Sequence, residues 1–138
     1  MSGLDRFVDA QEGAFARARS ELTAGRKRSH WMWYIFPQIA GLGHSAMSQR
    51  YAIVDMDEAK AYLAHPLLGP RLIELTEIVN ALPGGDPLAL MGAPDDMKLH
   101  ASMTLFLRAS TAGAPFRAAL DKYFAGAEHP ATLERLDP

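Results

Sequence analysis

The segment from Pro94 to Ser110 constrains the fold most. Two acids, Asp95 and Asp96, stand where a helix would begin, and acids there complement the positive end of the helix dipole. Apolar and mostly polar residues then alternate up to Arg108, which is a strand pattern, but the residue types, the acidic start and the length favour a helix. Wound as a helix, the apolar side chains fall on two opposing flanks. Because such a helix is sandwiched inside a domain, we expect it to be the central helix of the fold.

Short helical patterns separated by glycine and proline occupy the rest of the chain. Asp55 with Glu58 resembles a capping box. The predicted helices span residues 4–24, 45–51, 55–64, 70–82, 94–110 and 115–124, with shorter turns at 86–92 and 131–136. The aromatic run 31–36 fits either a buried strand or one turn of helix. Residues 1–138 therefore predict one compact, mainly α domain of six or seven helices around the segment Pro94–Ser110.

Composition excludes several classes of protein. With 138 residues, 49% hydrophobic and 22% charged, the chain has the make-up of a globular domain rather than a disordered one. The absence of cysteine excludes disulfides and thiolate metal sites, and it suits a reducing cytosol. The net charge of −2 gives no basic field for nucleic acid or anionic lipid. Since no apolar run is long enough for a membrane span or a signal peptide, we expect a cytoplasmic protein with no membrane partner.

An ordered set of motifs runs along nearly the whole chain. It consists of His30-Trp31-Met32-Trp33, Phe36-Pro37-Gln38, Gly41-Leu42-Gly43-His44-Ser45, Tyr51-Ala52-Ile53, the stretch from Glu58 to Leu72, Pro94-Asp95-Asp96-Met97-Lys98-Leu99 and Ser102-Met103-Thr104-Leu105-Phe106. In these motifs the chain resembles an uncharacterised bacterial family of small, mostly α-helical proteins, a domain of unknown function whose members are sometimes mislabelled calpastatin. That label does not fit, because calpastatin is disordered and this composition is that of a packed domain. The resemblance implies a helical fold and supplies no reaction.

The region from His30 to Tyr51 is the first candidate site. Glycines let backbone N–H groups approach a ligand closely, and tryptophan faces stack on planar rings or hold cations. Its candidate ligand-binding residues are Trp31, Trp33, Gln38, Gly41, Gly43, Ser45 and Ser48, with His44 as a candidate acid or base. A purely structural interpretation also fits, in which the tryptophans are core, the glycines serve a turn and Ser45 caps its own helix.

The polar stripes of the predicted central helix form the second candidate site. The candidate ligand-binding residues there are Asp95, Asp96, Lys98 and Ser102, and His100 is the second candidate catalytic residue. Asp96 and His100 are one turn apart, which is the spacing of a carboxylate that orients an imidazole, and Lys98 and Ser102 have the spacing of a Ser–Lys pair. The structural alternative is a helix start whose acids and hydroxyls bond locally. No ligand spacing for a metal occurs and no cofactor is expected.

Three functions follow from these residues. In the first, the Gln38–Ser48 loop and the Asp95–Thr104 helix enclose a pocket for a small anionic or nucleotide-like ligand, with Lys98 and Arg50 as donors. In the second, exposed apolar surface near residues 39–47 makes the chain a protein-interaction module without catalysis. In the third, which the net charge disfavours, Arg26–His30 serves a nucleic-acid accessory protein. Whether the protein is an enzyme stays open at the level of sequence, as does its oligomeric state.

Overall fold

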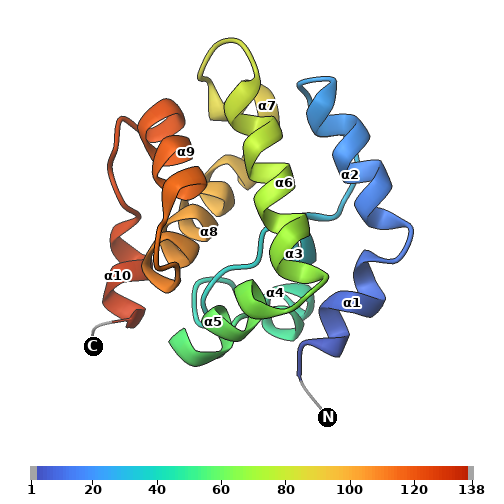
Figure 1. Ribbon diagram of the computed structural model, residues 1–138, viewed down its shortest axis with the longest axis vertical. Coiled ribbons are helices and arrows are strands. Elements are labelled where there is room, and N and C mark those ends of the chain that lie inside the picture. Colours follow the sequence, from blue (N-terminus) through green and yellow to red (C-terminus); the bar gives the residue numbers. More distant parts are fainter. Residues whose placement is uncertain (1–2, 137–138) are drawn as a thin grey trace.

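The fold is built from short helices around one buried helix (Figure 1). The computed structural model describes residues 3–136, and within them it has ten α-helices. These are α1 Asp5–Gln11, α2 Ala14–Thr23, α3 Met32–Ile35, α4 Ala46–Arg50, α5 Met56–Ala64, α6 Leu68–Ala81, α7 Pro87–Met91, α8 Asp95–Ala109, α9 Ala114–Phe124 and α10 Pro130–Leu136. The mainly α class is confirmed, with more helices than the six or seven expected.

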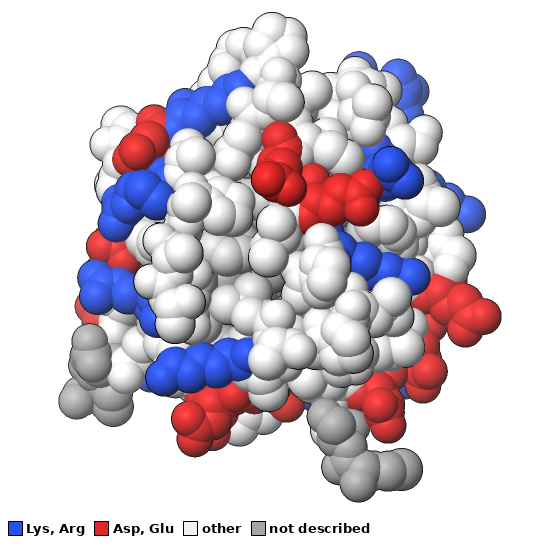
Figure 2. All heavy atoms as spheres, viewed as in Figure 1, with Lys and Arg blue, Asp and Glu red and all other residues white. Residues whose placement is uncertain are grey.

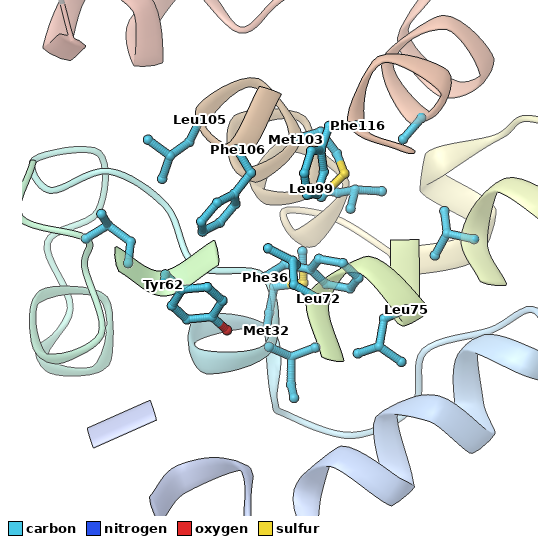
Figure 3. Packing of buried hydrophobic residues seen from close by; sticks show 14 of the residues in the cluster. Met32, Phe36, Tyr62, Leu72, Leu75, Leu99, Met103, Leu105, Phe106 and Phe116 are labelled. Atoms are coloured by element: carbon cyan, nitrogen blue, oxygen red, sulfur yellow. The ribbon is translucent and has the colours of Figure 1, made fainter. Parts of the chain in front are cut away.

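The central position of α8 is also confirmed. It packs against α5, α7, α9 and α10, and every residue from Ala101 to Phe106 is buried. Six consecutive buried positions leave no solvent-facing stripe in this part of the helix, which is the expected result of apolar residues on two flanks. In the core, Phe106 of α8 points toward Tyr62 of α5, and their ring centroids lie 5.2 Å apart (Figure 3).

Side-chain caps set several helix starts as the sequence predicts. Asp55 Oδ1 accepts the N–H of Glu58 at 2.9 Å, and Ser45 Oγ accepts the N–H of Ser48 at 3.1 Å. Asp86 caps α7, with Pro87 in the first turn. Each cap satisfies a backbone donor that would otherwise have no partner within its helix.

Two boundaries differ from the prediction. The single helix predicted over residues 4–24 is wrong, because the chain breaks at Gly13, whose φ of 78° is incompatible with a continuous α-helix. The helix predicted from Pro70 starts at Leu68 instead, and Pro70 lies within its first turn, where a missing N–H is tolerated. The open question over residues 31–36 resolves to one helical turn, α3.

Candidate functional site

A small pocket lies between the α3–α4 loop and the segment that follows α4. It has a volume of about 170 Å³. Its lining residues are Trp33, Gln38, Ile39, Ala40, Gly41, Gly43, Ser48, Gln49, Tyr51 and Ala52. None of these ten carries a charged side chain. Aromatic faces, two side-chain amides and two hydroxyl groups therefore provide stacking surface and neutral hydrogen-bonding groups.

Backbone hydrogen bonds join the two walls of this pocket. The N–H of Ile53 donates to the carbonyl of Gln38 and the N–H of Ala40 donates to the carbonyl of Ile53, both at 2.8 Å. Arg6 of α1 supports the second wall by donating to the carbonyl of Ala52 at 2.7 Å. The pocket is thus held open by main-chain pairing rather than by side chains alone.

Both glycines of the loop are constrained, Gly41 by its positive φ and Gly43 by the close approach of Ser48. Gly41 has a φ of 96°, and a Cβ at this position would lie 2.7 Å from Cζ of Arg135. Gly43 has no such backbone requirement, but its Cβ would lie 2.6 Å from Cβ of Ser48. The loop can approach α4 and α10 this closely only because these positions lack side chains.

Replacing Gly43 with alanine should distort the pocket and destabilise the protein by about 1–2 kcal/mol, the usual range for overpacking. Removing the Ser48 side chain in the double variant G43A/S48G frees the space. A double-mutant cycle by chemical denaturation should therefore give a favourable coupling of at least about 0.5 kcal/mol between the two substitutions. Strict additivity would contradict the close approach.

A cationic side chain lies over the ring of each of the two aromatic residues that line the pocket. Nζ of Lys98 lies 5.4 Å from the Trp33 ring centroid, and Cζ of Arg50 lies 5.5 Å from the Tyr51 ring centroid. These distances are within the range of cation–π contacts. Each of the two aromatic residues of the neutral pocket therefore has a positive charge over its ring.

The charge of Lys98 is only partly neutralised. Asp95 forms an ion pair with Lys27 at 2.7 Å and a longer one with Lys98 at 3.6 Å. Two lysines thus share one carboxylate, which leaves an excess positive charge in this cluster. The Lys27 side chain is 7% exposed, whereas that of Lys98 is 22% exposed, so Lys98 is the more accessible of the two.

The structure brings together part of the predicted site. Five candidate residues line the pocket: Trp33, Gln38, Gly41, Gly43 and Ser48. Trp31 and Ser45 fit the structural interpretation instead, because Trp31 is 1% exposed in the core and the Ser45 hydroxyl caps α4. No residue of α8 lines the pocket. Lys98 contacts one lining residue, Trp33, through its cation–π interaction with the ring.

The remaining residues of the central helix make none of the predicted catalytic pairs. Ser102 is fully buried, and among residues 3–136 its hydroxyl finds no hydrogen-bond partner, so the Ser–Lys pair is absent. Lys98 pairs with Asp95 instead. Asp96 is half-buried in the first turn of α8. The ring of its predicted partner His100 stacks instead on Phe124 at the end of α9.

Neither candidate catalytic histidine lines the pocket. His44 is exposed in the loop, and its carbonyl accepts from the side-chain amide of Gln49 at 2.9 Å. His100 lies at the junction of α8, α9 and α10, where its Nε2 meets the carbonyl of Ala127 at 2.7 Å and its ring stacks on Phe124 with centroids 4.2 Å apart.

The predicted nucleic-acid segment uses part of its chemistry internally. Lys27 is buried in its ion pair with Asp95, and the indole of Trp31 donates to Glu21 at 2.9 Å. Figure 2 shows basic and acidic side chains interspersed over one face, not a single-sign field. A continuous basic stripe with a free aromatic face is what nucleic-acid binding would need, and residues 26–31 do not provide one.

Glu21 organises this segment. Burial works to raise the pKa of Glu21, but hydrogen bonds from the Ser29 hydroxyl, from the backbone of Arg28 and Ser29 and from the Trp31 indole outweigh it and lower the pKa from 4.5 to about 2. A lowered folded-state pKa means that the ionised carboxylate stabilises the fold above pH 4.5 and that this contribution is lost as the pH falls toward 2.

Glu21→Gln should therefore destabilise the protein at pH 7 by about 1–2 kcal/mol, the scale of lost hydrogen bonds to a partly exposed charged group. The difference in unfolding free energy from the unsubstituted protein should shrink as the pH is lowered from 4.5 to 2. Urea titrations at several pH values measure it, and a difference independent of pH would contradict this role of the carboxylate.

The apolar surface predicted near residues 39–47 is mostly covered. Ile39 is 4% exposed, and Leu42 and Met47 pack against the core. Within residues 3–136 the exposed large apolar residues are Val54, Ile73, Leu88 and Met97. The exposed apolar surface that the sequence predicted at residues 39–47 for a protein-interaction module is thus not found there.

Several pocket residues were missed by sequence reasoning. Gln49 and Ala52, which flank the already named Tyr51, line the pocket because the main-chain pairing of Ile53 with Gln38 folds this segment back onto the loop. A pairing across such a gap has no local sequence signal. The one available hint was the stretch Tyr51-Ala52-Ile53, which belongs to the motifs that carry the family resemblance.

Residues 3–136 contain no cluster of three or more His, Asp or Glu side chains arranged to hold a metal ion. None of their helices combines the length and the apolar content that crossing a bilayer requires.

The fold and the site define a helical domain with a small neutral pocket beside a lysine–aspartate cluster. The chain belongs to the family described as protein of unknown function DUF1810, whose model matches residues 1–136. It is similar to the conserved hypothetical protein Rv1873 from Mycobacterium tuberculosis, known from a crystal structure, with 50% identity and a TM-score of 0.96. That match covers 98% of this chain and 96% of the other. Among curated proteins no sequence matches.

Proposed function

We propose that this chain is a cytoplasmic domain that binds a small anionic or nucleotide-like ligand in the pocket between the Gln38–Gly43 loop and the Ser48–Ala52 segment. The observation that carries the proposal is the pair of cations on the aromatic walls, Lys98 on Trp33 and Arg50 on Tyr51. A neutral, partly aromatic pocket with positive charge at its border suits a planar or polar group that bears an anionic substituent.

The chemistry of the lining supports the same class of ligand. The amides of Gln38 and Gln49 each offer a donor and an acceptor, which is the pattern that pairs with the edge of a heterocycle or with an amide. The volume of about 170 Å³ is below the roughly 300–1,000 Å³ of pockets for drug-sized ligands. The pocket therefore holds one ring or one head group, and the rest of a larger ligand extends toward the cations.

A thermal-shift screen tests this proposal. The probes are inorganic phosphate, pyrophosphate and the four ribonucleoside monophosphates, each at matched ionic strength. A ligand at about 100 times its dissociation constant stabilises the fold by about 2.7 kcal/mol, which for a domain of this size raises Tm by on the order of 10 °C. A flat response to every probe would overturn the proposal.

Two lysine variants distinguish the pocket from general charge effects. Lys98→Gln removes the charge beside Trp33 and should weaken binding of an active probe about tenfold. Lys60→Gln removes an exposed lysine on α5 and should leave the affinity unchanged. Equal losses in the two variants would mean that the probe responds to overall charge rather than to this site.

A further inference from the structure

At two places in this protein a histidine followed by a proline accepts backbone N–H groups just before or within the first turn of a helix. Nδ1 of His65 accepts the N–H groups of Leu67 and Leu68 at 3.1 and 3.2 Å, at the start of α6. Nδ1 of His129 accepts the N–H of Thr132 at 3.3 Å and lies 2.9 Å from its hydroxyl, at the start of α10. An imidazole nitrogen accepts a hydrogen bond only while it carries no proton. The cap that His129 provides at the start of α10 thus depends on a neutral imidazole.

The surroundings of His129 disfavour its charged form. From α8 the facing titratable group is His100, whose ring lies edge-on with centroids 5.2 Å apart. The residue before His129, Glu128, has its two carboxylate oxygens bound by Arg108 of α8 at 2.6 and 3.0 Å. From α9 the neighbour is the uncharged ring of Phe124, stacked on His100.

The charged residues of α10 itself, Glu134 and Arg135, are exposed farther along the helix. Burial, and secondarily the nearby His100, lower the pKa of His129 below its usual 6.5. Protonation of His129 is therefore favoured when this junction opens and water reaches the ring.

The last turn of α10, the helix that follows His129, contacts a residue that lines the pocket. Arg135, in the last turn of α10, donates to the carbonyl of Gly41 at 3.3 Å, and its guanidinium occupies the space that a Cβ of Gly41 would need. Gly41 is a lining residue of the pocket. Helix α10 and the loop that contains Gly41 are thus in direct contact.

We propose that His129 is a pH-sensitive cap that couples α10 to the pocket: protonation of Nδ1 removes the acceptor for Thr132, α10 is released, and Arg135 leaves the Gly41 loop. That this coupling regulates ligand binding rests on the proposed function, whereas the coupling itself does not. Because the folded-state pKa lies below the unfolded value, the closed form is fully favoured above pH 6.5 and loses ground as the pH falls toward the folded-state pKa.

Amide NMR of the full chain without any ligand tests the coupling between pH 7.5 and 5.5. The population of released α10, measured by hydrogen exchange at Thr132 relative to amides of α9, should rise about tenfold per pH unit between the two pKa values of His129. The Gly41 amide signal should titrate with the same midpoint. A Gly41 signal that ignores the titration of His129 would overturn the proposal.

Three variants make this result specific. His129→Asn keeps a capping acceptor that does not titrate, so the pH response of both Thr132 and Gly41 should vanish. The matched control His65→Asn alters the equivalent cap of α6 and should leave both responses intact. In Arg135→Ala, Thr132 should still respond and Gly41 should not. An unchanged Gly41 response in either His129→Asn or Arg135→Ala would contradict the coupling, whatever the outcome of the ligand screen.

Discussion

Replacing Phe106 with alanine is expected to lower the free energy of unfolding by about 4 kcal/mol, within the range for truncating a buried phenylalanine. Phe106 is fully buried in the last turn of α8 and packs against Tyr62 and Phe116, with ring centroids 5.2 and 6.0 Å away. Its removal leaves a cavity between rings from α5 and α9 that the surrounding helices cannot close without shifting.

The control for this substitution is Leu88→Ala. Leu88 is 53% exposed in α7, so its truncation should change the unfolding free energy by no more than about 0.5 kcal/mol. Urea denaturation followed by circular dichroism measures both variants. A loss below about 1.5 kcal/mol for Phe106→Ala would contradict the central role assigned to α8.

Gly69→Ala is expected to destabilise the protein by about 3 kcal/mol, which is opposite in sign to the usual effect. Alanine in a helix interior normally gains about 1 kcal/mol over glycine, and Gly69 lies in the first turns of α6. Here a Cβ would overlap the carbonyl oxygen of Leu63 at the end of α5. Backbone atoms cannot rotate away as a side chain can, so α5 and α6 would have to separate.

A propensity control accompanies this variant. Ala61 is exposed in the middle of α5, and Ala61→Gly should lower the free energy of unfolding by about 1 kcal/mol, the usual difference in helix propensity. Differential scanning calorimetry of both variants gives the comparison. Stabilisation by Gly69→Ala would mean that α5 and α6 are not in the close contact described.

Much of the fold could be predicted because its signals are local. The acidic start and two apolar flanks identify α8, and Asp55, Ser45 and Asp86 each cap the helix predicted for them. The break at Gly13 was missed, because a single glycine within a helical pattern costs only about 1 kcal/mol and is often tolerated. The positive φ of Gly13 reflects how α1 and α2 pack, which the sequence does not encode locally.

The candidate site could be predicted only in part because its contacts are not local. The loop residues Gln38, Gly41 and Gly43 were found from their types, and they line the pocket. The second wall is folded against them by the pairing of Ile53, which no spacing rule reveals. The pattern of α8 correctly indicated polar residues near the interior, but most of them bond within their own surroundings rather than facing the pocket.

The capping histidines show another limit of sequence reasoning. His129 precedes a proline, and this dipeptide alone does not show whether its imidazole accepts from the following helix. Contacts with Thr132 and with His100 of another helix decide the matter. The functional interest of His129 therefore arises from tertiary packing.

The two tryptophans allow the most direct test of ligand binding at the pocket. Trp33 lines it, whereas the buried indole of Trp31 donates to Glu21 and serves as an internal reference. In a titration with pyrophosphate and with each ribonucleoside monophosphate, at constant ionic strength, the indole N–H signals of both residues are followed by NMR. We predict that at least one probe shifts the Trp33 signal saturably, together with the Gln38 amides, and leaves the Trp31 signal in place. Saturable shifts confined to other surfaces, or an unmoved Trp33 signal with every probe, would contradict the assignment of this pocket as the ligand site.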